Sequence, residues 1–138
     1  MKSWSFTALA AALCVAAAPV LAEGDAAKGE KTFKKCKACH MIVNGDDVIV
    51  KGGKVGPNLF GVIGRAAGSA EGYKFGKDML AAGEAGLVWD EAQVAEYVKD
   101  PKKFLASYLD KSSVKTKMTF KLKKGGEDVA AYLASVAE

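Results

Sequence analysis

Cys36-Lys37-Ala38-Cys39-His40 is the stretch of sequence on which the fold of this chain depends. Two cysteines three positions apart at the end of a helix present their sulfur atoms to the same side, and the next residue adds an imidazole. This spacing is the attachment pattern of a c-type haem: the sulfurs bond to the two vinyl groups on one porphyrin edge, and the histidine binds the iron. We therefore predict one covalent haem c, held by Cys36 and Cys39, with His40 as an axial iron ligand.

Three other kinds of site also use paired cysteines: a disulfide, a redox-active thiol pair and a zinc site. A structural zinc site normally has four cysteine or histidine ligands, and after loss of the N-terminal segment described below only Cys36, Cys39 and His40 remain. A thioredoxin-like pair is expected in an alternating pattern of strands and helices, which this sequence lacks. A disulfide would not need the histidine that follows Cys39, so the motif favours haem.

The first 22 residues have the character of a secretory signal peptide. Lys2 supplies a positive start, residues 6–20 form an apolar run rich in alanine, and Ala22 places a small residue at the cleavage position. A transmembrane anchor is the alternative, but the run is shorter than the ~20 residues needed to cross a bilayer. We expect a cleaved signal at residues 1–22 and one mature domain at residues 23–138.

The charge of the mature domain is mildly positive. It keeps all of the basic residues except Lys2, 19 of 20, and all 16 acidic ones, which gives a net charge of about +3. Proteins that bind nucleic acid through their charge usually have a higher isoelectric point and a denser basic stripe. We expect neither nucleic-acid binding nor stable membrane insertion.

The mature sequence predicts an all-α domain of several short helices and long loops. Apolar residues recur at helical spacing, and Asp90 and Asp100-Pro101 are typical helix starts. The predicted helices cover residues 25–37, 73–82, 90–98, 100–109 and 127–136. Turn-forming residues predict a loop at 44–58, although Val48-Ile49-Val50 could pair briefly as a strand. The predicted loops at 59–69 and 110–124 are long for a compact domain, unless a buried cofactor supplies part of the core.

A six-coordinate haem iron needs a second axial ligand, and the sequence has no second histidine. A methionine thioether is the natural candidate and raises the reduction potential. Met41 adjoins His40 and cannot reach the opposite face of the ring, and Met79 is explained as core filling in a predicted helix. Met118 lies in the aperiodic segment 116–120, where a loop could fold across the distal face. We predict Met118 as the second ligand, with an apolar anchor of that loop as the alternative.

Further motifs extend over the mature chain. They are Gly24-Asp25-Ala26-Ala27-Lys28-Gly29, Phe33, Gly56-Pro57-Asn58-Leu59, Glu96-Tyr97-Val98, Asp100-Pro101-Lys102-Lys103-Phe104 and Thr116-Lys117-Met118-Thr119-Phe120. With the attachment motif, this series resembles the class I cytochromes c, most closely the cytochrome c2 type of purple bacteria. The resemblance implies that the N- and C-terminal helices cross at Gly29 and Tyr132. Compared with the shorter mitochondrial members, this chain is longer at 45–54 and 106–115.

The resemblance also implies contacts around the haem. The Pro57 carbonyl would accept a hydrogen bond from His40 and fix the orientation of the ring, as partners of metal ligands do. Arg65, Tyr73 and Trp89 would surround the haem propionates. Arg65 is the only arginine in the chain, and a guanidinium suits such bidentate recognition.

On the distal side, the Tyr97 hydroxyl would approach the sulfur of Met118, and Thr116 would belong to the same haem-contacting segment. The implied function is that of a periplasmic, monomeric one-electron carrier, not an enzyme. Its donor would be a cytochrome bc1-type complex, and its acceptor a photosynthetic reaction centre or a terminal oxidase. A haem enzyme or gas-binding protein with an open sixth position is the competing hypothesis. Cytochrome c′ is a second one, but its attachment motif lies near the end of a four-helix bundle and not near the mature start.

Lysines cluster around the attachment motif and around the segment that contains Met118, and they could form a docking face for acidic redox partners. An ordinary solvated surface is the alternative. The predicted face comprises Lys35, Lys37, Lys102, Lys103, Lys117 and Lys121. If these lysines steer association, the bimolecular rate falls steeply with ionic strength.

Overall fold

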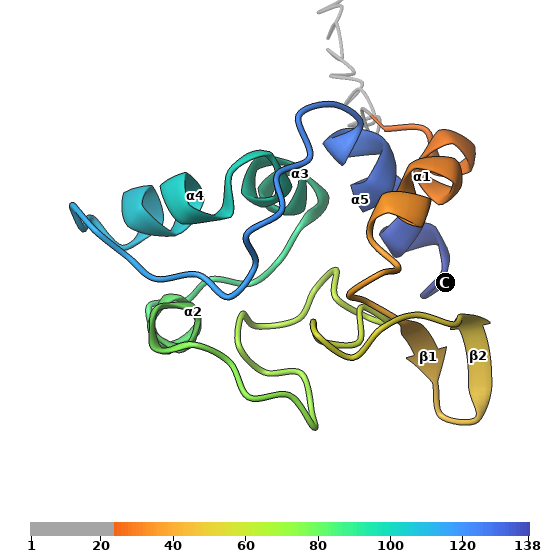
Figure 1. Ribbon diagram of the computed structural model, residues 1–138, viewed down its shortest axis with the longest axis horizontal. Helices are drawn as coiled ribbons and strands as arrows, with labels where there is room; N and C mark the ends of the chain where they lie inside the picture. Colours follow the sequence, from red (N-terminus) through yellow and green to blue (C-terminus); the bar gives the residue numbers. More distant parts are fainter. Residues whose placement is uncertain (1–23) are drawn as a thin grey trace, which may run out of the picture.

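The computed structural model describes residues 24–138, and the predicted signal segment 1–22 lies outside them. Within this part, five α-helices and one two-stranded hairpin are joined by long irregular segments (Figure 1). The elements are α1 (Ala26–Thr32), a 3₁₀ turn η1 (Phe33–Lys35), β1 (Ile42–Asn44), β2 (Asp47–Val50), α2 (Lys77–Glu84), α3 (Glu91–Lys99), α4 (Pro101–Tyr108) and α5 (Gly126–Ser135). None of these helices is long and apolar enough to cross a membrane. The predicted mainly helical class is confirmed.

The first and last helices pack directly against each other, as Figure 1 shows for α1 and α5. A side chain at Gly29 would overlap the backbone carbonyl of Asp128, so the crossing requires a glycine there. The rings of Phe33 and Tyr132 meet at 5.7 Å between centroids. The backbone N–H of Asp25 also donates to Asp128 Oδ1 at 2.8 Å. The implied crossing at Gly29 and Tyr132 is therefore present.

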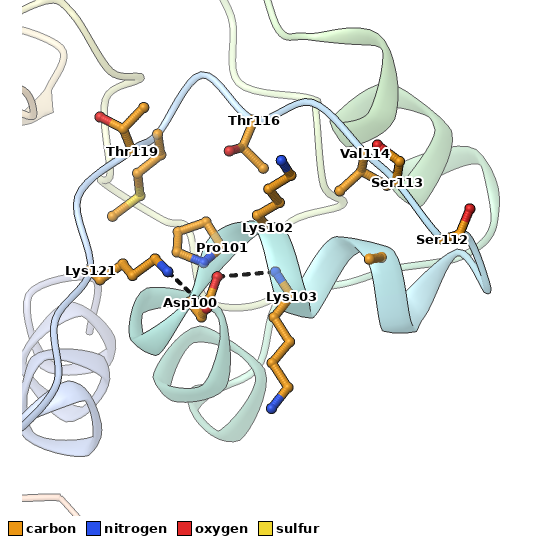
Figure 2. A pocket seen from close by; sticks show the side chains of 12 residues that line it. Asp100, Pro101, Lys102, Lys103, Ser112, Ser113, Val114, Thr116, Thr119 and Lys121 are labelled. Atoms are coloured by element: carbon orange, nitrogen blue, oxygen red, sulfur yellow. Dashed lines mark hydrogen bonds and ion pairs between the residues drawn. The ribbon is translucent and has the colours of Figure 1, made fainter.

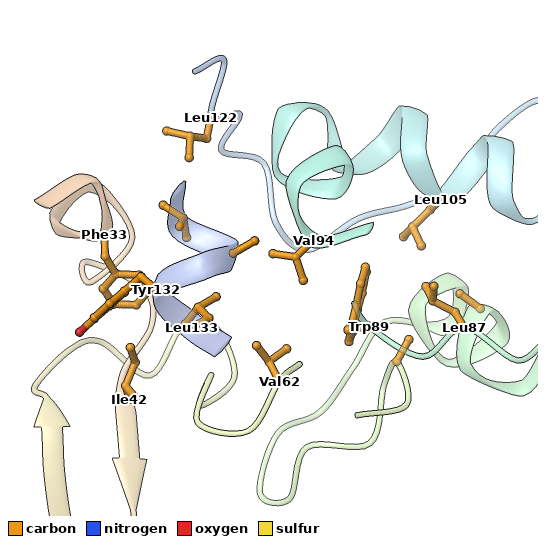
Figure 3. Packing of buried hydrophobic residues seen from close by; sticks show 14 of the residues in the cluster. Phe33, Ile42, Val62, Leu87, Trp89, Val94, Leu105, Leu122, Tyr132 and Leu133 are labelled. Carbon is orange, nitrogen blue, oxygen red and sulfur yellow. The ribbon is translucent and has the colours of Figure 1, made fainter. Parts of the chain in front are cut away.

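One hydrophobic core runs from the α1–α5 crossing to the pair α3–α4 (Figure 3). Its buried members come from helices and from irregular segments alike. They include Phe33, Ile42, Val62, Leu87, Trp89, Val94, Leu105, Leu122, Tyr132 and Leu133. Val62, Leu87 and Leu122 lie outside the helices, so packing against this core fixes the path of the long loops.

Both predicted helix starts are confirmed. Asp90 Oδ1 accepts the backbone N–H of Gln93 at 2.7 Å and caps α3. Asp100 Oδ1 accepts the N–H of Lys103 at 3.1 Å and caps α4, with Pro101 in its first turn. Each carboxylate satisfies an N–H group that the helix itself leaves free.

Two predicted helix boundaries are wrong, and one predicted loop contains a strand. The helix predicted over 25–37 ends at Thr32, and the chain tightens into the 3₁₀ turn before the cysteines. The helix predicted over 73–82 begins only at Lys77, because Gly76 has an extended backbone. Residues 47–50 lie in the segment predicted as a loop, but they form β2, as the possible short strand at residues 48–50 allowed. β2 pairs antiparallel with β1, and the two-residue turn Gly45-Asp46 joins them. The loops predicted over 59–69 and 110–124 contain no helix and no strand.

Candidate haem site

The attachment motif lies in the turn that follows η1. The N–H of Cys36 donates to the Phe33 carbonyl at 2.7 Å, and the N–H groups of Cys39 and His40 both donate to the Cys36 carbonyl, at 3.1 and 3.0 Å. Both thiols are free, with Cys36 partly buried and Cys39 exposed. Burial, with a smaller effect of Cys39, raises the pKa of Cys36 to about 11. The thiol is therefore protonated at neutral pH, which does not suit a redox-active thiolate pair.

His40 is oriented by the segment that follows the hairpin. Its Nδ1 lies 2.9 Å from the Pro57 carbonyl oxygen, which can only accept, so Nδ1 carries the proton and Nε2 is free to bind a metal. Burial lowers the pKa of the imidazole and keeps the ring neutral. The ring packs on the backbone of Gly56, where a Cβ atom would overlap it. The hydrogen bond to Pro57 that the resemblance implies is thus present.

Asn58 fastens this segment to the hairpin, a role that the sequence reasoning missed. Its Oδ1 accepts the N–H groups of Val43 at 3.0 Å and Phe60 at 3.1 Å, and its Nδ2 donates to the Val43 carbonyl at 2.8 Å. The N–H of Leu59 donates to the Met41 carbonyl at 3.0 Å. The Pro57 carbonyl is therefore held in place from β1.

Arg65 holds the same segment from the other side. Its Nη1 donates to the Phe60 carbonyl at 3.1 Å and its Nη2 to the Asn58 carbonyl at 3.2 Å. Burial lowers the pKa of the guanidinium, which nevertheless stays charged at any physiological pH. The guanidinium thus makes the expected bidentate contact, but its acceptors are the backbone carbonyls of Asn58 and Phe60. Contact with the haem propionates stays a prediction.

An aromatic cluster continues from Arg65. The N–H of Trp89 donates to the Arg65 carbonyl at 2.9 Å, and the indole ring lies 5.1 Å from the ring of Tyr97 and 5.7 Å from that of Phe104. Burial, with a smaller effect of Tyr73, raises the pKa of Tyr97 to about 12. The phenol therefore keeps its proton at neutral pH and can donate a hydrogen bond. Two of the aromatic residues predicted at the site, Trp89 and Tyr97, thus pack together, and Phe104 contacts both.

Met118 and Thr116 lie on the irregular segment between α4 and α5. Both are partly buried and line one cavity of about 440 Å³, whose other wall is the start of α4. Figure 2 shows Thr116 and Thr119 on this segment, across from Asp100 and Pro101. The N–H of Leu122 donates to the Val98 carbonyl at 2.7 Å and joins the segment to α3, next to Tyr97.

The side chains present fit a covalent haem c by their donor chemistry. Two free thiols three positions apart match the two attachment points, and His40 offers an unprotonated Nε2 whose direction Pro57 fixes. Met118 adds a thioether, a ligand typical of electron-transfer haems. Among residues 24–138 no group of three or more His, Cys, Asp or Glu side chains could hold a metal ion by itself.

Two of the six lysines predicted to dock partners are engaged within the chain. Lys121 Nζ pairs with Asp100 Oδ2 at 3.0 Å, and Lys117 Nζ lies 5.4 Å from the centre of the Tyr73 ring and donates to the Lys74 carbonyl. The other four are exposed, and no ion pair engages them within the described residues. These four are Lys35, Lys37, Lys102 and Lys103.

Known proteins resemble this chain over most of its length, although no protein-family model matches it. Cytochrome c-551 of Roseobacter denitrificans is 58% identical over 131 residues, which cover 94% of each chain. Cytochrome c2 of Rhodobacter capsulatus is 56% identical over 135 residues, which cover 97% of this chain and 98% of that protein. The solved structure of cytochrome c2 from Rhodobacter capsulatus superposes with a TM-score of 0.81, at 57% identity, over 83% of this chain and 100% of that one. The chain therefore belongs to the cytochrome c2 family of class I cytochromes c, electron carriers whose haem c is held through cysteines with the spacing of Cys36 and Cys39.

Proposed function

We propose that this chain is a periplasmic one-electron carrier in which His40 and Met118 occupy both axial positions of the haem iron. The observation that carries the proposal is the 2.9 Å hydrogen bond from His40 Nδ1 to the Pro57 carbonyl. It selects the tautomer with a free Nε2 and fixes the direction of the ring before any metal is bound. A histidine held rigidly in this way suits an iron that changes its oxidation state but keeps the same ligands.

The surrounding residues serve electron transfer in distinct ways. The bound haem supplies the one-electron change between ferric and ferrous iron. The Met118 thioether and the apolar surroundings favour the ferrous state and raise the reduction potential. Tyr97, protonated at neutral pH, would donate its hydroxyl hydrogen toward the Met118 sulfur, and Trp89 and Phe104 pack beside it and exclude water.

The proposed role as a cytochrome c2-type carrier also implies a location in the periplasm and redox partners in the membrane. Residues 1–22 would direct the chain to the periplasm and be removed there. Electrons would pass from a cytochrome bc1-type complex to a photosynthetic reaction centre or a terminal oxidase. Lys35, Lys37, Lys102 and Lys103, which are exposed, would contact acidic docking sites on these complexes.

Optical spectra of the purified holoprotein test the axial ligands. We expect the weak red absorption that marks a methionine sulfur on ferric iron, and a ferrous form that does not bind carbon monoxide at neutral pH. Met118→Ala should lose the red absorption and gain carbon monoxide binding, whereas Met79→Ala, a matched methionine in α2, should do neither. Ready carbon monoxide binding by the unaltered protein would instead show an open sixth position and exclude the carrier function.

A further inference from the structure

Asp78, in the first turn of α2, is the one charged side chain that is buried among residues 24–138, with 3% of its surface exposed. Lys111 Nζ donates to Asp78 Oδ1 at 3.0 Å, and the backbone N–H of Lys115 donates to Oδ2 at 2.7 Å. Burial of a carboxylate is costly unless it is paired and hydrogen-bonded, and here each oxygen has a partner. Both partners belong to one segment of the chain, so the carboxylate ties that segment to α2.

The tied segment is the first half of the loop that leads to Met118. After α4 the chain reverses at Asp110, whose φ of 52° lies in the left-handed region, and it contains no helix or strand before α5. In the described structure, no backbone–backbone hydrogen bond involves residues 112–121. Lys115 comes three residues before Met118. The path of this half therefore depends on the Asp78 tether and on the buried Val114 beside it.

The second half of the loop is held separately. Lys121 pairs with Asp100 at 3.0 Å, but the lysine side chain is 45% exposed, and ion pairs of this kind contribute little. The backbone bond from Leu122 to Val98 fixes the end of the loop at α3. Contacts thus hold the loop on both sides of Met118. Before it, Lys117 also contacts Tyr73 and the Lys74 carbonyl, but its side chain is exposed, so Asp78 is the buried polar contact on that side.

We propose that Asp78 is a positioning residue for Met118: through Lys111 and the Lys115 N–H it holds the loop in the conformation that keeps the thioether on the iron. The inference rests on the proposed function, because it requires Met118 to be the axial ligand. An added ligand can bind the iron only when the loop opens. Its apparent affinity therefore measures how strongly the closed loop is favoured.

Titration of the ferric holoprotein with imidazole at neutral pH tests this role. Loss of the red absorption reports the displacement of the Met118 sulfur by imidazole. Asp78→Asn keeps the size of the side chain and removes its charge. We expect about a tenfold rise in imidazole affinity, since a hydrogen bond to a charged group is lost. Lys111→Gln removes only the exposed partner and should give a smaller rise in the same direction. It also keeps the test available if Asp78→Asn does not fold.

Asp128→Asn is the matched control. Asp128 also accepts a backbone N–H through a carboxylate oxygen, but it lies in α5 and its partner is Asp25 at the start of α1, not a residue of the loop. A rise in imidazole affinity in the Asp78 and Lys111 variants that is absent in Asp128→Asn supports the positioning role. Equal affinities in all variants, or equal rises in the control, overturn it. If the unaltered protein lacks the red absorption, the axial assignment itself fails, and the two failures are thereby distinguished.

Discussion

Replacement of Asn58 by alanine is expected to lower the free energy of unfolding of the holoprotein by about 2–3 kcal/mol. The side chain makes three hydrogen bonds to the backbone, at 2.8, 3.0 and 3.1 Å, and all are partly buried. Each such bond contributes a net ~1 kcal/mol, and backbone groups left without a partner add to the loss. Because the three bonds share one side chain, their contributions are not independent, and about 3 kcal/mol is an upper figure.

Guanidinium unfolding followed by far-ultraviolet circular dichroism measures this loss. Asn58→Asp retains both acceptor contacts but sets a carboxylate oxygen against the Val43 carbonyl oxygen in place of the donor, so it should be destabilised as well. Asn44→Ala is the matched control, because Asn44 is exposed in the hairpin and its side chain makes no hydrogen bond within residues 24–138. An Asn58→Ala protein as stable as the Asn44→Ala protein would refute the view that this amide fastens the histidine side of the site.

Three further outcomes are expected. Gly29→Val should lower the unfolding free energy by about 3 kcal/mol in the same assay, because its side chain would overlap α5, whereas Ala27→Val on the exposed face of α1 should change it little. The pKa of Tyr97 is raised to about 12 in the folded state. Between pH 10 and about 12 the phenol is therefore protonated in the folded protein and ionised in the unfolded chain. Stability should therefore fall by about 2 kcal/mol more between pH 10 and about 12 in the unaltered protein than in Tyr97→Phe, and parallel curves would contradict this. Lys103→Glu should slow reduction by a bc1-type complex several-fold at low ionic strength and much less at high salt, with Lys28→Glu as the comparison, and a salt-independent rate would exclude steering.

The parts that sequence alone could predict are those encoded in short, local patterns. The attachment motif is contiguous, so its meaning does not depend on the rest of the fold. The caps at Asp90 and Asp100 are equally local, because a helix start involves only the next three residues. The choice of Met118 came from elimination among few sulfur ligands, and its place on the iron remains a prediction.

What sequence could not predict depends on contacts between distant residues. Asp78 looks like any first-turn acid of a helix, and its burial becomes visible only once Lys115, 37 residues later, is placed against it. In the sequence Asn58 has only the character of a turn residue, and its hydrogen bonds to Val43 of β1 appear only in the folded chain. The sequence predicts the strand at 47–50 only as a possibility, because its residues are exposed at most positions and lack the alternation that would separate a strand from a loop.

The crossing of α1 and α5 also sets the order of events during biogenesis. Asp25 bonds to Asp128, 103 residues further on, so the first helix finds its packing partner only after almost the whole chain has been made. Closing so long a loop is slow relative to local turns. Cys36 and Cys39 emerge early and belong to an open chain during that interval. The thiols are then still accessible, so attachment of the haem can precede the closure that later encloses it.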